Sequence, residues 1–148
     1  AHEALHQLAQ NVRGICAAAA NSGVEVTGVE RVASAVRCAE RNARANGVAE
    51  RCDFVAADAT EWMSHKAGEK HFDVVLMDPP RAGSTPEFLH GAADLAPERV
   101  VYVSCNVQTQ ARDLEVLLGR GYTLRSVAPV DMFPHTKHVE SVAVLARR

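Results

Sequence analysis

The apolar positions of this chain follow two periods that alternate along its length. Short runs rich in valine and other β-branched or aromatic residues are typical of buried strands. Between them, apolar residues spaced three or four apart predict amphipathic helices. The predicted strands cover residues 24–29, 52–57, 72–77, 100–103, 122–130 and 138–146, and the predicted helices cover residues 32–46, 85–95 and 107–118.

The first twenty residues have a different pattern. Residues 2–20 are rich in Ala, Leu, Gln and His, and their apolar side chains are again spaced three or four apart. This spacing predicts one amphipathic helix or two. Asn21, Ser22 and Gly23 form a typical helix end.

The order of the elements predicts the fold class. Strands that alternate with helices form a parallel sheet with helices on both faces, which is an α/β fold. The last two predicted strands are joined without a helix. They must therefore pair antiparallel, because a parallel pair needs a crossover.

Composition narrows the class of protein. The chain has 148 residues, 47% hydrophobic residues and a net charge of -2, which is typical of one globular domain without a basic nucleic-acid signature. None of the four cysteines forms a C-x-x-C pair, so we expect no zinc site and a reducing, cytoplasmic location. No apolar run is long enough to span a membrane.

Three acidic residues follow predicted strands. Glu30, Asp58 and Asp78 would meet at one edge, because the carboxyl ends of parallel strands lie together and bind ligands there. Each could instead cap a helix, and for Asp58 alone a cap is at least as plausible. The loop Asp78-Pro79-Pro80-Arg81 is stiffened by its prolines, which would hold Asp78 and Arg81 in fixed positions.

Cys105 stands between a predicted strand and a predicted helix, with Asn106 or Thr109 as the candidate helix cap. A helix N-terminus favours the thiolate, the reactive form of cysteine. From the residues alone, a nucleophile and a buried core cysteine are about equally plausible.

Glu140 lies early in the last predicted strand, residues 138–146. It would reach Cys105 as a general base if the two strands are neighbours, although a solvent-facing residue is the simpler interpretation. His135 and His138 flank Lys137, but no third ligand is suitably spaced, so we expect no metal site.

Five segments of the chain together resemble the catalytic domain of the RNA uracil-5-methyltransferases. They occur in the order and spacing of that family over residues 24–148. The segments are V-T-G-V-E (26–30), F-D-V-V-L-M-D-P-P-R-A-G (72–83), V-Y-V-S-C-N (101–106), R-D-L (112–114) and D-M-F-P-H-T-K-H-V-E (131–140).

The resemblance implies a Rossmann-like class I methyltransferase fold with S-adenosylmethionine as cofactor. The substrate would be a uridine in tRNA or ribosomal RNA, methylated at C5 and flipped out of its stack. Residues 1–148 would form a single catalytic domain of a longer protein, whose RNA-binding domains lie upstream. Two alternatives are a methyltransferase of the same fold with another substrate and a non-catalytic fragment that binds RNA or a partner.

The resemblance also assigns roles to five residues. Cys105 would attack C6 of uracil, and Glu140 would remove the C5 proton. Glu30 would bind the cofactor ribose, Asp58 would lie near the adenine, and Asp78 would contact cofactor and base. For Arg81 we infer a sixth role, in which its charge would stabilise negative charge at the base or phosphate.

One part of the family fold has no counterpart in the pattern. The family has a central strand, between those at 24–29 and 72–77, that ends in a glycine-rich turn around the cofactor. Before residue 24 we find neither the strand nor the turn. The segment that begins at Gly14 could be the helix that follows the turn. We therefore expect that the first strand and its turn are missing.

Overall fold

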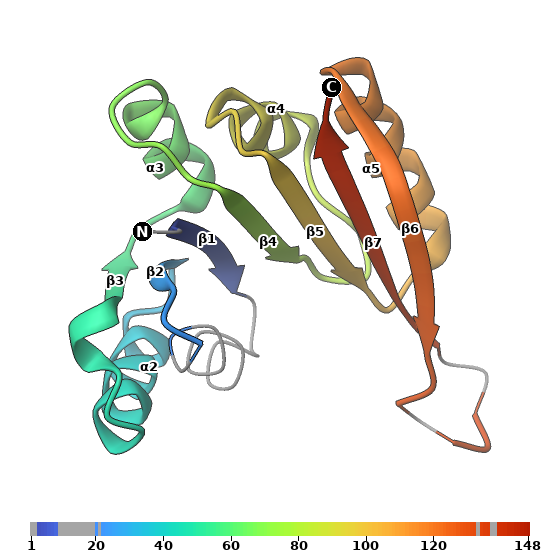
Figure 1. The fold of residues 1–148 in the computed structure, drawn as a ribbon. Coiled ribbons are helices and arrows are strands. Elements are labelled where there is room, and N and C mark those ends of the chain that lie inside the picture. The colour runs from blue at the N-terminus through green and yellow to red at the C-terminus, as the bar shows by residue number, and fades with distance from the viewer. Residues whose placement is uncertain (1–2, 9–19, 21, 133, 137–138) are drawn as a thin grey trace.

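The computed structural model describes residues 3–8, 20, 22–132, 134–136 and 139–148. Within these residues, seven strands form one sheet in the order β3-β2-β1-β4-β5-β7-β6 (Figure 1). The strands are β1 Glu3–Leu8, β2 Glu25–Glu30, β3 Cys52–Ala56, β4 Val74–Asp78, β5 Arg99–Ser104, β6 Tyr122–Val130 and β7 Glu140–Arg147. Strands β1 to β5 are parallel, whereas β7 runs antiparallel to both of its neighbours, β5 and β6.

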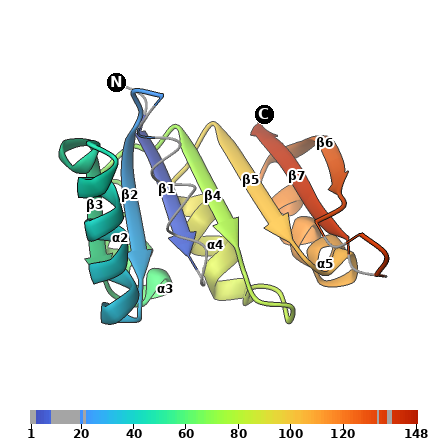
Figure 2. The same ribbon diagram turned by 90° about the horizontal axis from the view of Figure 1, so that it is seen from below.

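Helices cover both faces of the sheet, as predicted. Helix α2 packs on one face, and α3, α4 and α5 lie side by side on the other (Figures 1 and 2). The larger core lies under the second group and contains Phe72, Met77 and Tyr102, while the smaller core joins Val26 of β2 to Ala39 and Ala43 of α2. The helices are α2 Ala33–Ala45, α3 Ala59–Lys66, α4 Pro86–Asp94 and α5 Val107–Gly119, with a short 3-10 turn, η1, at Ala49–Arg51.

Local sequence signals explain where the helices begin and end. Asp58, Thr85 and Asn106 each accept a hydrogen bond from a backbone N–H in the first turn of the helix that follows. Pro86 occupies the first turn of α4, where its missing N–H costs nothing. Gly47 ends α2 with a φ of 68°. The helices predicted over 32–46, 85–95 and 107–118 are confirmed to within one residue at each end.

The predicted missing strand is present, so that prediction is wrong. Residues 3–8, which we assigned to a helix, form β1 in the middle of the sheet (Figure 2). Their backbone pairs with β2 on one side and with β4 on the other. This pairing overrides the helical propensity of Ala, Leu and Gln, because a central strand gains hydrogen bonds along both edges. The predicted absence of the glycine-rich turn concerns residues 9–19, which lie outside the described residues.

The strand order determines where a ligand can bind. Strands β2 and β3 lie on one side of β1, and the chain then crosses to β4 on its other side. This reversal is a topological switch point, and open α/β sheets bind ligands outside the carboxyl ends of the strands there. Asp78, at the end of β4, pairs in register with Leu8 at the end of β1. Over the described ranges, no helix is long and apolar enough to cross a membrane.

Candidate functional site

A cavity of about 740 Å³ opens at the carboxyl edge of the sheet. Its volume falls within the range of pockets that bind small molecules and cofactors. Four segments form it: the junctions that follow β2, β3 and β4, and the first turn of α4. The lining residues are Val29, Glu30, Arg31, Val32, Ala35, Ala57, Asp58, Ala59, Thr60, Pro79, Pro80, Gly83, Ser84, Thr85 and Phe88.

Glu30 and Asp58, two of the predicted site residues, lie together in the lining of this cavity. The Oε1 atom of Glu30 accepts a hydrogen bond of 2.7 Å from the backbone N–H of Val32, which fixes the carboxylate at the end of β2. Asp58 caps α3, where its Oδ1 atom accepts from the N–H groups of Thr60 and Glu61 at 2.9 and 3.2 Å. The helix-cap alternative is therefore correct for Asp58, and the same residue also lines the cavity.

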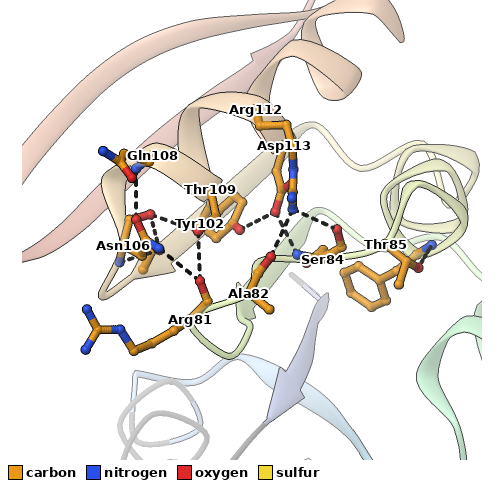
Figure 3. Close-up of polar contacts among 12 residues, drawn as sticks. Arg81, Ala82, Ser84, Thr85, Tyr102, Asn106, Gln108, Thr109, Arg112 and Asp113 are labelled. Carbon is orange, nitrogen blue, oxygen red and sulfur yellow. Dashed lines mark hydrogen bonds and ion pairs between the residues drawn. The ribbon is translucent and has the colours of Figure 1, made fainter.

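The loop after β4 forms another wall of the cavity. Pro79 and Pro80 line it, while Asp78 is half-buried and Arg81 is exposed. The Arg81 carbonyl accepts hydrogen bonds from Asn106 Nδ2 and Thr109 Oγ1 at 3.1 and 3.2 Å. In Figure 3 the guanidinium of Arg81 points away from these contacts. The backbone of this residue is thus fixed to α5, and its charged group is left at the surface.

Cys105 lies in a tight turn between β5 and α5, where it is half-buried. Its two polar neighbours shape that turn. The Oγ atom of Ser104 accepts from the Asn106 N–H at 3.0 Å, and the Asn106 side chain caps α5 by accepting from the Gln108 N–H at 3.1 Å. A core cysteine would need none of these contacts. The S-C-N segment therefore builds a turn that presents the thiol at the edge of the sheet.

Glu140 comes to the same edge because β7 is antiparallel to β5. Ser104 pairs in register with Ser141, the last pair of this ladder. Cys105 directly follows Ser104, and Glu140 directly precedes Ser141. Both residues are half-buried, unlike the fully buried pair Ser104 and Ser141. The pairing of β5 with β7 therefore places both residues at the same end of these two strands.

Gln110, which the sequence pattern did not single out, holds these two strands in place. It is only 3% exposed, and its Nε2 atom donates to the Tyr102 carbonyl at 3.0 Å and to the Ser141 carbonyl at 3.3 Å. One side chain from α5 therefore joins β5 and β7 within a few residues of Cys105 and Glu140. A glutamine on a mainly apolar helix face was the only sequence signal for this role.

Asp113 is a second residue that sequence reasoning missed. Its carboxylate is 1% exposed and accepts from Tyr102 Oη at 2.6 Å, from the Ser84 N–H at 2.7 Å, and from Arg112 Nε and Nη2 at 2.9 and 2.7 Å. These contacts satisfy a charge that burial would otherwise disfavour. They also join α5, β5 and the loop after β4 (Figure 3). Asp113 belongs to the R-D-L segment (112–114), which contributed to the family resemblance but to which the sequence analysis assigned no role.

The six predicted site residues therefore fall into three neighbouring groups. Glu30 and Asp58 line the cavity, Asp78 and Arg81 belong to the loop that walls it, and Cys105 and Glu140 lie at the ends of β5 and β7. Among the described residues, no group of three or more His, Cys, Asp or Glu side chains is arranged to hold a metal ion. His135 is exposed and has a φ of 68°, and His138 is outside the described residues.

Comparison with known proteins identifies the family. Residues 6–148 match the family model of tRNA (uracil-5-)-methyltransferases. The chain belongs to this family. The resemblance drawn from the five sequence segments is confirmed, and the matched range includes the second half of β1.

Individual relatives agree with this assignment. An uncharacterised RNA methyltransferase of Geobacter sulfurreducens is 42% identical over 99% of this chain and 30% of its own length. A 23S rRNA (uracil(1939)-C(5))-methyltransferase of a Marinomonas species is 42% identical over 83% of the chain and 28% of its own length.

A solved structure has the same fold. The tRNA (uracil-54, C5)-methyltransferase of Pyrococcus abyssi, in complex with S-adenosyl-L-homocysteine, superposes with a TM-score of 0.81 at 34% identity. The superposition covers 99% of this chain and 34% of that protein. The predicted class I methyltransferase fold is confirmed. The chain spans about a third or less of the length of each of these relatives.

The buried hydrogen-bond network predicts how the two tyrosines of the chain ionise. Burial, then the hydrogen bond to Asp113 and its negative charge, raise the pKa of Tyr102 far above the ordinary value of 10.0. Burial also raises the pKa of Tyr122, against smaller opposing effects of Arg147 and Arg120. The unfolded chain ionises near pH 10, so the stability from these neutral phenols is complete below that pH and is lost as the pH rises above it.

We therefore expect the ultraviolet absorbance of tyrosinate to appear only together with loss of the folded circular dichroism signal. Tyr102→Phe and Tyr122→Phe variants assign each part of the absorbance change. Tyrosinate that forms reversibly near pH 10 in the folded chain would contradict the buried network.

Proposed function

We propose that this chain is the catalytic domain of an RNA uracil-5-methyltransferase that uses S-adenosylmethionine and a covalent cysteine adduct. The observation that supports the proposal is the pairing of β5 with β7, which places Cys105 and Glu140 next to the paired residues Ser104 and Ser141 at the carboxyl edge of the sheet. A thiol near a carboxylate is what addition to uracil and later proton removal require. Relatives of this fold that methylate amino groups need no such pair.

The residues of the cavity fit the proposed cofactor. The carboxylate of Glu30 follows the second strand along the chain, the place where nucleotide-binding folds bind ribose hydroxyls. Asp58 lies beyond the next strand, near where the adenine would lie, and Asp78 precedes the two prolines of the wall. S-adenosylmethionine would supply an electrophilic methyl group at this edge.

Cys105 would begin the reaction at uracil. Its thiolate adds to C6, and the electron pair of the C5–C6 double bond moves toward C5 and the O4 carbonyl. C5 is thereby activated to take the methyl group, which the isolated ring does too poorly to be useful. The exposed guanidinium of Arg81 is suited to stabilise the negative charge on the base or on a neighbouring phosphate.

Glu140 would complete the reaction. It takes the proton from C5, the electrons of that bond re-form the C5–C6 double bond, and the thiolate of Cys105 leaves C6. A general base must lie near the proton that it removes, and the place of Glu140 next to Ser141, the partner of Ser104, supports this role. The target base must first leave its stack to reach the two residues.

The rest of the protein is part of the proposal. The relatives named above are three to four times as long as the matched region, so we propose that further domains supply RNA binding. This would account for a domain without a basic signature. One of those relatives acts on tRNA and another on 23S rRNA, and either RNA class agrees with the catalytic residues. We also propose a cytoplasmic location.

Covalent trapping tests the proposed function. RNA that contains 5-fluorouridine should form a stable adduct with the complete protein in the presence of S-adenosylmethionine, because fluorine cannot leave C5 as a proton does. Denaturing electrophoresis measures the adduct. Cys105→Ala should abolish it, while Cys38→Ala, a matched change at another half-buried free cysteine, should not. An unreactive wild-type protein would overturn the function, and an adduct that survives Cys105→Ala would overturn the nucleophile.

The role of Glu140 has its own test. Glu140→Gln should allow the adduct with ordinary RNA to form but should slow its resolution by a factor on the order of 10² to 10⁴, the usual contribution of a general base. Single-turnover kinetics separate the two phases. Glu115→Gln, at an exposed position on α5, is the control. Normal turnover by Glu140→Gln would exclude Glu140 as the base.

Cofactor binding tests the role of Glu30. Glu30→Gln should weaken binding of S-adenosylhomocysteine about tenfold, because charge-assisted hydrogen bonds to ribose become neutral ones. Calorimetric titration measures the affinity. Glu25, at the opposite end of β2, provides the matched change Glu25→Gln, which should have no effect. Equal affinities of the two variants would show that Glu30 does not bind the cofactor.

A further inference from the structure

The loop of residues 79–85 joins the two halves of the site. It follows Asp78, lines the cavity with five of its residues, and reaches across to α5, the helix that begins next to Cys105. Its conformation therefore sets how the cavity is placed relative to the thiol. Short loops of this kind are mobile unless other elements hold them.

Three residues outside the loop hold it, and we call them the Asp113 clamp: Tyr102, Arg112 and Asp113. Asp113 Oδ2 accepts from the Ser84 N–H at 2.7 Å, and Arg112 Nη2 donates to the Ala82 carbonyl at 3.0 Å. Tyr102, which is fully buried in β5, donates to the same Oδ2 atom at 2.6 Å. The loop is thus hydrogen-bonded to α5, and through Asp113 it is connected to β5 (Figure 3).

Gly83 allows this close approach. A Cβ atom at this position would lie 2.5 Å from Arg112 Nη2 and 2.6 Å from Asp113 Oδ2. Both distances are shorter than a Cβ atom makes to an atom that it is not bonded to. The residue also has a φ of 80°, a conformation that favours glycine. Loop and clamp are therefore fitted to each other, and a single methyl group at Gly83 would push them apart.

We propose that the Asp113 clamp is a positioning device for methyl transfer: it fixes loop 79–85, and with it the cofactor, relative to Cys105. This inference rests on the proposed function. The clamp residues do not touch the reacting atoms. They act through the loop, because a displacement of about 1 Å between reacting groups can cost roughly 100-fold in rate.

The two chemical steps of the reaction depend on the clamp differently. Addition of Cys105 to C6 and proton removal by Glu140 need only β5 and β7, so they can exchange the C5 hydrogen with water without any methyl transfer. In that exchange C5 takes a proton from solvent, Glu140 removes the original hydrogen, and the thiolate leaves. Methyl transfer also needs the cofactor in place. A loosened loop should therefore slow methyl transfer more than exchange.

The experiment compares tritium release from RNA labelled at C5 of uridine with methyl incorporation, in the complete protein at saturating S-adenosylmethionine. Two variants loosen the clamp, and each has a matched control. Arg112→Ala removes a 57% exposed side chain that holds the loop, and Arg120→Ala removes an arginine at the other end of α5 that pairs with Asp94. Gly83→Ala introduces the clash, and Gly68→Ala adds a methyl group at a similar φ, 82°, with no atom within 4 Å. Asp113 is left unchanged, because its burial makes unfolding the expected result of substitution.

We expect Arg112→Ala and Gly83→Ala to lower the rate of methyl transfer about 10- to 100-fold. Tritium released per methyl group transferred should rise several-fold, while both controls keep the wild-type ratio. A purely structural defect lowers both signals together, so an unchanged ratio in both clamp variants would overturn the proposal. Wild-type protein with neither signal would overturn the proposed function instead, which keeps the two failures distinct.

Discussion

A carboxylate buried in a protein interior is tolerated only where other groups satisfy its oxygens and balance its charge. Asp113 meets this condition with a phenol from β5, a backbone N–H from loop 79–85 and the guanidinium of the neighbouring Arg112. Moving the strand or the loop would remove a hydrogen bond from this buried carboxylate. The relative position of loop, strand and helix at the candidate site is therefore determined by the hydrogen bonds of one acidic residue.

The direction of one strand has an equally large effect. In a wholly parallel sheet, the first residue of the last strand would lie at the other edge of the sheet, far from Cys105. Because β7 is inserted antiparallel between β5 and β6, its first residue, Glu140, comes to the carboxyl edge instead. Gln110 of α5 then joins the backbones of β5 and β7 by donating to a carbonyl of each strand. The first residue of β7 and the residue that follows β5 thus lie at the same end of the sheet.

Several residues at this edge serve the fold and the site together. Asp58 caps α3 and lines the cavity, and Asn106 caps α5 while it holds the carbonyl of Arg81. At this edge a residue such as Asp58 can therefore cap a helix and line the cavity at the same time. A cap must lie at the junction of strand and helix, and in a parallel sheet those junctions are the ligand-binding edge.

The sequence alone determined the elements whose signals are local. Hydrophobic periods, caps such as Asn106, and the prolines at 79 and 80 placed the helices and most strands, and the order of strands and helices fixed the α/β class. The family motifs then pointed to Cys105 and Glu140. Only the tertiary structure decided that residues 3–8 form a central strand, because their helix-favouring composition is overruled by pairing with β2 and β4, which lie far away in the chain. It also decided the role of Asp113, whose partners at positions 84 and 102 come from separate elements that no local pattern connects.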